Sequence, residues 1–502
     1  MTPSTPPTIS TLGELRKSGY QPRSIQDELR ENLMAKIAGG DPLFPGVLGY
    51  EETVIPQMER AVLAGHSMNL LGLRGQAKTR MARGLTDLLD EWVPVVPGSV
   101  LNEDPLMPIL ASTAAQLTEQ GDKSPIGWLH KSDRYVEKLA TPDVSVADLI
   151  GDVDPIKAAN LKLDYSDERV IAYGLIPRSH RCIFVINELP DLQPRIQVAL
   201  FNILQERDIQ IRGFRMRLGL ELQFVFTANP EDYTSRGAII TPLKDRIQSQ
   251  ILTHYPDSLD ISGQITAQEA HVRPEQRERV TILPLVADLL ERVAFAARDS
   301  EYIDENSGVS ARLTITAYEH LVAGAELRAL RTGDSQTFSR IMDLLSILPA
   351  VTGKVELVYE GEREGPEKVA LHLIGKAIRT RFPETFPDPE LVRRKKMDDV
   401  YAPIVAHFAE EGLDLLRSDT DLAYTEKLAG VPGLADLVNR YVPDLEREAL
   451  IVMMEFVLHG LAEHNLIGKS VVDGEVSFSD LMSGLFGGNN ADDDEAGDNG
   501  FR

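Results

Sequence analysis

The segment from Ser67 to Trp92 constrains the fold of this chain more than any other part of its sequence. A short apolar run at 67–71 indicates a β-strand, and helical periodicity runs from Lys78 to Trp92. Between them stands Gly-Leu-Arg-Gly-Gln-Ala-Lys-Thr, at 72–79. A glycine-bearing turn between a strand and a helix gathers backbone N–H groups around an anion. The segment therefore predicts a phosphate-binding loop in an α/β fold.

Each residue type in this loop suits one part of ATP and Mg²⁺ binding. Gly72 and Gly75 allow the backbone to bend toward the phosphates. Lys78 supplies a point charge for the β- and γ-phosphates, and Thr79 offers a hydroxyl to Mg²⁺. Ala77 stands where the usual pattern has glycine, and its methyl group is expected to crowd the phosphates or strain the loop. The predicted cofactor-binding residues are Gly72, Gly75, Gln76, Ala77, Lys78 and Thr79.

A second feature follows about a hundred residues later, where the buried strand 181–186 ends in Asn187 and Glu188. An acidic pair is expected at this place, the first residue holding Mg²⁺ through water and the second acting as general base. Asn187 removes one negative charge, although its side-chain oxygen can still accept a hydrogen bond from a metal-bound water. The sequence therefore predicts Glu188 as the base, with Thr79 and Asn187 as the metal residues.

Three further polar residues complete the predicted site. The apolar strand 222–227 leads to Asn229, which is placed to orient the attacking water. Since ligands of parallel α/β sheets bind at the carboxyl ends of the strands, these features are expected to meet in one crevice. Arg246 and Arg312 offer fixed charges that match phosphate oxygens. The predicted catalytic residues are Glu188, Asn229, Arg246 and Arg312.

The rest of the chain divides into ranges of different character. Strands alternate with helices up to about residue 258, which predicts a parallel sheet covered by helices, and helical periodicity dominates afterwards. The predicted ranges are a polar lead and one helix at 1–40, an α/β nucleotide-binding domain at 41–258 with an insertion at about 94–140, a helical lid at 259–352, a mostly helical region at 353–486, and a disordered acidic tail at 487–502.

Composition excludes several functional classes. A net charge of −25 disfavours binding to the phosphate backbone of nucleic acids. No apolar run reaches the roughly eighteen residues that span a bilayer, and the N-terminus lacks a secretory pattern, so a cytoplasmic location is expected. The single cysteine, Cys182, lies in an apolar run and is expected to be a buried core thiol.

The order of these motifs resembles the AAA+ ATPases, in particular the magnesium-chelatase I-subunit and MoxR-type branch, over about residues 41–350. The segments that carry the resemblance, besides the loop, are 46–49, 148–154, 174–177, 204–207 before a predicted hairpin, 229–231 and 245–246. The resemblance implies a P-loop αβα core with a helical lid. It also implies sensor roles for Asn229 and Arg312, and an arginine finger at Arg246 that reaches a neighbouring subunit.

The resemblance further implies a homo-hexameric ring and a partner protein that carries a von Willebrand A domain. The leading hypothesis is an ATP-hydrolysing motor that remodels a partner for metal insertion or protein maturation. A second hypothesis, motivated by Ala77 and Asn187, is a nucleotide-gated scaffold with little hydrolysis. A third, a DNA-directed AAA+ machine, is disfavoured by the acidity of the chain and by the lack of a recognisable DNA-binding helix pair.

Overall fold

The chain folds into two compact units, Met1–Tyr255 and Pro256–Arg502. The computed structural model describes residues 5–164, 167–206, 209–211, 214–216, 218–230, 238–395, 399–472 and 474–481. The predicted acidic tail lies outside these ranges, as do Arg207 and Glu231 of the resemblance motifs. Within the described residues, every helix is too short or too polar to cross a membrane.

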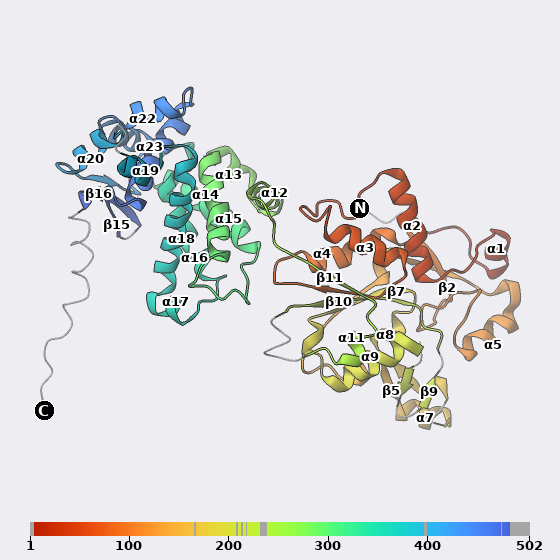
Figure 1. The fold of residues 1–502 in the computed structure, drawn as a ribbon. Coiled ribbons are helices and arrows are strands. Elements are labelled where there is room, and N and C mark those ends of the chain that lie inside the picture. The colour runs from red at the N-terminus through yellow and green to blue at the C-terminus, as the bar shows by residue number, and fades with distance from the viewer. Residues whose placement is uncertain are drawn as a thin grey trace, which may run out of the picture. The chain divides into compact units, whose positions relative to one another are not determined.

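The first unit is built on a five-stranded parallel sheet, shown at its centre in Figure 1. The strand order is β11-β1-β10-β7-β4. Strands β7 and β10 are buried on both faces, as expected of near-continuous apolar runs inside a covered parallel sheet. The strands are β1 (Met68–Leu71), β4 (Tyr135–Leu139), β7 (Cys182–Asn187), β10 (Leu222–Ala228) and β11 (Ser249–Leu252).

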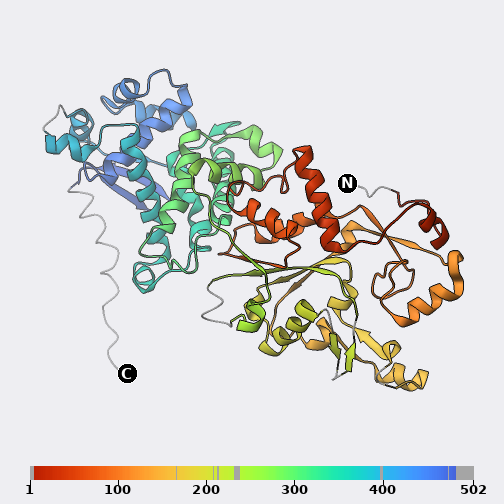
Figure 2. The ribbon, with the colours of Figure 1, turned by 45° about the vertical axis from the view of Figure 1, so that its right-hand side comes forward.

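Helices cover both faces of this sheet (Figures 1 and 2). On one face, apolar residues of α2 (Ile25–Gly39), α3 (Val54–Leu63) and α4 (Lys78–Gly84) pack against β1, β7 and β10. On the other face, α8 (Leu175–Arg178), α9 (Pro194–Glu206) and α11 (Thr241–Lys244) join a second apolar cluster with β7 and β10. The predicted α/β class with a parallel sheet is therefore confirmed.

Shorter elements surround this core. They are α1 (Leu12–Lys17), α5 (Ala111–Gln120), α6 (Val146–Leu149) and α7 (Pro155–Leu161), with the antiparallel pairs β2 (Trp92–Val95) with β3 (Gly127–His130), β5 (Gly151–Val153) with β6 (Ile171–Tyr173), and β8 (Ile209–Ile211) with β9 (Phe214–Met216). The pair β8–β9 is the hairpin expected after α9. Cys182 is fully buried, and burial raises the pKa of its thiol to about 11, so it is a core thiol as predicted.

Two sequence expectations need correction in this unit. The range 94–140, interpreted as an insertion, supplies strand β4 of the central sheet. Residues 135–139 form no continuous apolar run, because β4 lies at the sheet edge and is at most half-buried. The helix expected from Lys78 to Trp92 ends at Gly84, continues as a 3₁₀ turn to Leu88, and gives way to β2.

A buried ion pair fixes helix α2 to the sheet. Arg134, just before β4, donates two hydrogen bonds of 2.6 Å to the carboxylate of Glu28. Its Nε also donates to the carbonyl of Arg181 at 2.9 Å, while Glu28 accepts from the Asp90 N–H at 2.7 Å. Both side chains of the pair are almost fully buried. Helix α2, the helix expected within 1–40, is thereby packed on the sheet of the first unit.

The second unit is mostly helical. Its helices are α12 (Leu259–Glu269), α13 (Pro274–Arg279), α14 (Pro284–Arg298), α15 (Arg312–Thr332), α16 (Leu348–Thr352), α17 (Tyr359–Glu364), α18 (Pro366–Arg381), α19 (Pro389–Lys395), α20 (Ala402–Phe408), α21 (Asp421–Ala429), α22 (Leu434–Tyr441) and α23 (Arg447–Glu463). Its strands are β12 (Val280–Thr281), β13 (Thr337–Phe338), β14 (Leu413–Leu415), β15 (Gly468–Val472) and β16 (Glu475–Ser479). Helices dominate after residue 258, as the sequence predicts.

One apolar cluster runs through this unit from Val286 to Phe478. It therefore includes both the predicted lid at 259–352 and the region at 353–486. The two ranges are also joined by Glu455 of α23, whose buried carboxylate accepts hydrogen bonds from the N–H groups of Ile341 at 2.6 Å and Met342 at 2.9 Å. The range predicted as a lid and the later helices therefore share one large apolar cluster.

The helix expected over 389–411 is divided into α19 and α20. Residues 399–401 between them are not helical, and Pro403 lies in the first turn of α20. Proline is accommodated in a first turn but not in a helix interior, because its ring replaces an N–H and clashes with the preceding turn. The apolar period alone did not locate this boundary.

Candidate functional site

The carboxyl ends of three neighbouring strands bring the predicted residues together. In the register of the sheet, Leu71 of β1 is paired with Ala228 of β10. Phe226 of β10 is paired with Ile186 of β7, one residue before Asn187. The loop after β1, the asparagine after β10 and the acidic residue after β7 therefore leave the sheet side by side. This is the edge at which parallel α/β sheets bind ligands.

Lys78, Asn229 and Glu188 form a continuous chain of hydrogen bonds across this edge. The ammonium group of Lys78 donates to the Asn229 side-chain oxygen at 2.6 Å. The Asn229 amide nitrogen donates to the Glu188 carboxylate at 2.8 Å. Lys78 and Asn229 are buried, with 8% and 6% of their surfaces exposed. An ammonium group, an amide and a carboxylate are thus hydrogen-bonded in series, each from a segment that follows a different strand of the sheet.

Lys78 also closes the loop on itself. Its ammonium group donates to the backbone carbonyls of Gly72 and Leu73, the latter at 3.0 Å. Because carbonyl oxygens carry only partial charge, they are weaker partners for an ammonium group than phosphate oxygens. The lysine is therefore placed at the centre of the loop, where an incoming phosphate can replace these contacts.

The backbone of Glu188 takes the left-handed conformation, with φ 55° and ψ 51°. Its N–H donates to the Thr227 hydroxyl at 3.3 Å, and that hydroxyl donates to the Asn187 side-chain oxygen at 3.0 Å. Non-glycine residues are uncommon in this region and cluster at functional sites. Thr227, which the sequence analysis did not single out, therefore holds both Asn187, at the end of β7, and Glu188, just after it.

Packing around the loop explains two of its residues. A side chain at Gly72 would overlap the Thr253 hydroxyl and the Gln76 side-chain oxygen, at 2.0 and 2.2 Å. Those two groups are hydrogen-bonded to each other at 2.6 Å and are buried. Gln76 therefore holds the loop against Thr253, the residue that follows β11. The Tyr50 hydroxyl adds a hydrogen bond of 3.2 Å to the Gln76 carbonyl.

Ala77 adopts the left-handed conformation, with φ 54° and ψ 14°, next to Gly75 at φ 73°. This backbone explains why the usual pattern has glycine at this position. For a residue with a Cβ, the left-handed region costs on the order of 1–2 kcal/mol. Alanine in place of the usual glycine at position 77 therefore strains the loop backbone. Strain was one of the two effects expected from the sequence, beside crowding of the phosphates.

Ala77→Gly is expected to raise the stability of the first unit by about 0.5–1 kcal/mol, because relief of strain exceeds the added chain entropy. Calorimetry of the full chain should show the corresponding transition about 1–3 °C higher. Ala82→Gly, the same change inside helix α4, is the matched control and should lower the transition. Equal destabilisation by both variants would contradict strain at Ala77.

The metal-binding residues predicted from the sequence lie on two elements. Thr79 is exposed in the first turn of α4, and Asn187 is half-buried at the end of β7. Among the described residues, no three His, Cys, Asp or Glu side chains are grouped to hold a metal ion. Mg²⁺ needs no such group, since it keeps several waters and takes one or two carboxylates besides phosphate oxygens. The hydroxyl, amide and carboxylate donors here suit that chemistry.

In the contacts that the structure describes, neither predicted arginine is hydrogen-bonded to Lys78, Asn229 or Glu188. Arg246 stacks on the Phe201 ring, 4.0 Å from its centroid, and donates to the Gln205 side-chain oxygen at 2.7 Å. It is therefore held against helix α9 of the first unit. Arg312 is exposed at the start of α15 in the second unit. The role of each arginine stays a prediction.

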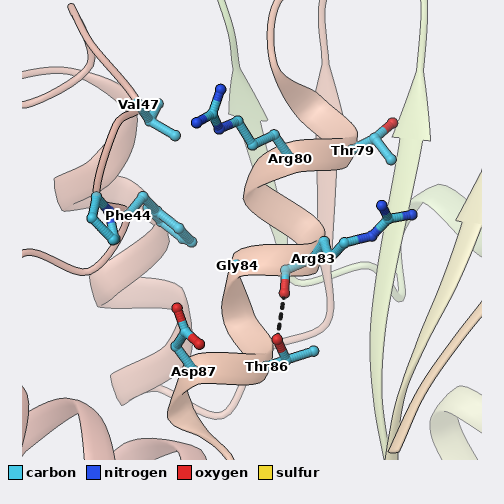
Figure 3. Close-up of a pocket in the computed structure, with 9 residues that line it drawn as sticks. Phe44, Val47, Thr79, Arg80, Arg83, Gly84, Thr86 and Asp87 are labelled. Atoms are coloured by element: carbon cyan, nitrogen blue, oxygen red, sulfur yellow. Dashed lines mark hydrogen bonds between the residues drawn. The ribbon is translucent and has the colours of Figure 1, made fainter. Parts of the chain in front are cut away.

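A pocket of about 440 Å³ lies beside the loop, between helix α4 and the segment that precedes α3 (Figure 3). Phe44 and Val47 form its apolar wall, and Arg80 extends toward Val47 in Figure 3. Thr79 contributes to the lining, so the pocket adjoins the phosphate loop directly. Its size suits a flat heterocyclic group with a few polar contacts. No motif predicts this pocket, because its two walls come from separate segments at 44–47 and 79–87.

No known family model matches this chain. Among solved structures, it is similar to a candidate ATPase from Cytophaga hutchinsonii, at 16% identity over 72% of this chain and 97% of that one, with a TM-score of 0.29. It is similar to magnesium chelatase, solved as a complex of subunits BchI and BchD, at 19% identity over 64% of this chain and 99% of that one, with a TM-score of 0.32.

A third similar structure is Hsp104 with ATPγS and casein, at 13% identity over 63% of this chain and 51% of that one, with a TM-score of 0.35. One of the proteins named in these matches, magnesium chelatase, is of the kind that the sequence motifs resemble.

Proposed function

We propose that this chain is a Mg²⁺-dependent ATPase of the AAA+ class, from the magnesium-chelatase I-subunit and MoxR-type branch. The observation that carries the proposal is the chain of hydrogen bonds from Lys78 through Asn229 to Glu188. It joins a phosphate-loop lysine, an orienting amide and a candidate base at the ligand-binding edge of a parallel sheet. These are the parts that phosphoryl transfer to water requires.

The residues have distinct tasks in this function. Lys78 exchanges its carbonyl partners for oxygens of the β- and γ-phosphates, and the backbone N–H groups of 72–79 and the α4 N-terminus add partial positive charge. Thr79 and Asn187 are the residues that would hold Mg²⁺, directly or through water. When bound, the ion neutralises phosphate charge. Glu188 takes a proton from the attacking water, which Asn229 orients.

The wider assembly follows from the resemblance and is part of the proposal. Arg246 acts as a finger toward the nucleotide of the next subunit in a homo-hexameric ring, and Arg312 as a sensor of the bound nucleotide. The ring works in the cytoplasm on a partner that carries a von Willebrand A domain. ATP turnover there drives metal insertion or protein maturation.

Lys78→Ala is expected to weaken ATP binding about 10- to 100-fold, because a charge-assisted contact to phosphate is lost. Mg²⁺-dependent phosphate release should disappear as well. Binding is measured with a fluorescent ATP analogue, and Lys17→Ala, on exposed helix α1, is the matched control. Undiminished binding and turnover in Lys78→Ala would exclude the proposed site.

A second candidate function is a nucleotide-gated scaffold that binds ATP and scarcely hydrolyses it. The strained backbone at Ala77 and the uncharged side chain of Asn187 favour it. The same assay separates the two functions. Tight ATP binding without Mg²⁺-dependent phosphate release from the native protein supports the scaffold, whereas steady phosphate release supports the motor.

A further inference from the structure

A carboxylate that the sequence analysis did not single out lies against Asn187. Glu137 is on strand β4, which is paired with β7 so that Leu139 lies opposite Asn187. The Asn187 side-chain amide donates to one carboxylate oxygen of Glu137 at 2.5 Å. The other oxygen accepts from Arg83 at 3.0 Å and from the Tyr135 hydroxyl at 3.1 Å.

This contact accounts for the departure at Asn187. An aspartate there would set a second carboxylate against Glu137, and two carboxylates at hydrogen-bond distance do not both ionise readily. Asparagine instead donates to Glu137 while its oxygen accepts from Thr227 at 3.0 Å. The carboxylate expected at the end of β7 is therefore present one side chain away, on the neighbouring strand, where it is also ion-paired with Arg83.

Glu137 also lies on the side of helix α4 that presents Thr79. Thr79 and Arg83 are four residues apart on α4 and so share one face. Figure 3 shows both side chains directed to the same side of the helix, away from Arg80. Because Arg83 is bonded to Glu137, this carboxylate faces the part of α4 that carries the predicted metal hydroxyl.

We propose that Glu137 is the carboxylate of the Mg²⁺ site, where it carries the charge that Asn187 lacks. It accepts hydrogen bonds from metal-bound water and holds the Asn187 amide in a fixed orientation, while Arg83 keeps the carboxylate directed toward the site. The inference rests on the proposed function, since it assigns a role within the same nucleotide site. It also removes one of the two grounds for expecting a scaffold without turnover.

Glu137→Gln tests this role through binding. The affinity of the full chain for a fluorescent ATP analogue is measured in EDTA and over a range of Mg²⁺ concentrations. Glu137→Gln should raise the Mg²⁺ concentration for half-maximal enhancement about 10- to 100-fold, a larger effect than any change in the affinity in EDTA. Glu119→Gln, the same chemical change on the exposed surface of α5, should leave both unchanged.

The charge-exchanged double variant Glu137→Gln with Asn187→Asp separates charge from side-chain identity. It returns a single carboxylate to the pair and should recover most of the Mg²⁺ response lost in Glu137→Gln. Asn187→Asp alone should lower the melting temperature in EDTA, because two carboxylates then face each other. The inference fails if Glu137→Gln keeps the native Mg²⁺ response, or if the double variant recovers none of it.

Failure of the Glu137 assignment can be told apart from failure of the proposed function. A native protein that binds no ATP analogue in either EDTA or Mg²⁺ overturns the nucleotide site as a whole. A native protein whose ATP binding is enhanced by Mg²⁺, with a Glu137→Gln variant that is enhanced equally, overturns only the assignment of Glu137.

Discussion

Replacing Glu188 by glutamine is expected to stop ATP turnover while ATP remains bound. The amide cannot take a proton from the attacking water, and loss of a general base slows such reactions by about 10²- to 10⁴-fold. The glutamine oxygen can still accept the hydrogen bond that Asn229 donates at 2.8 Å. The geometry of the site should therefore survive the change, and ATP affinity should stay close to the native value.

Single-turnover phosphate release and equilibrium binding of ATP, measured on the same preparation, check this result. Glu119→Gln on exposed helix α5 is the matched control and should hydrolyse ATP at the native rate. If Glu188→Gln hydrolyses ATP at the native rate, another residue activates the water. If it loses ATP binding as well, Glu188 has a structural role in place of a catalytic one.

Arg134→Ala is expected to have the largest effect on stability. The variant leaves the Glu28 carboxylate almost fully buried without its cation, and broken buried pairs typically cost about 3–5 kcal/mol. It also removes the hydrogen bond from Arg134 to the Arg181 carbonyl. Because Glu28 lies on α2, the loss should detach the N-terminal helix from the sheet and lower the unfolding transition of the first unit.

Calorimetry and limited proteolysis of the full chain measure this loss, with cleavage expected near α2. The matched control is Arg16→Ala, which breaks an ion pair to Asp122 in which more than half of each side chain is exposed. Exposed pairs contribute only about 0–1 kcal/mol. If the two variants unfold at similar temperatures, the buried pair does not anchor α2.

The central fold was predictable where a local pattern and the tertiary environment agree. Strands β7 and β10 are continuous apolar runs because both of their faces are covered, and such runs are visible in sequence. Strand β4 was missed because it lies at the sheet edge, where adjacent charged residues are accommodated and no continuous apolar run is needed. Helix boundaries inside 389–411 were missed because periodicity continues across a non-helical turn.

The residues of the candidate site also fall into two groups, those that the sequence predicts and those that only the structure reveals. Lys78, Glu188 and Asn229 were predictable because each follows a recognisable strand, and the carboxyl ends of parallel strands share one edge. The contacts of Glu137 and Thr227 with Asn187 could not be predicted, because they depend on pairing between strands that are distant in the sequence. The strain at Ala77 was foreseeable as one of two alternatives, since a left-handed position is one reason for the usual glycine.

The shared core of the second unit has a mechanical consequence. A lid with its own core could pivot as a small flap and leave the helices after residue 352 at rest. Here α23 is tied to the turn at Ile341 through buried Glu455, and the apolar cluster passes without interruption from Val286 to Phe478. Since close-packed interiors transmit displacement instead of absorbing it, a push on α15 is carried to β16. We therefore expect the helices that share this cluster to move together as one rigid body.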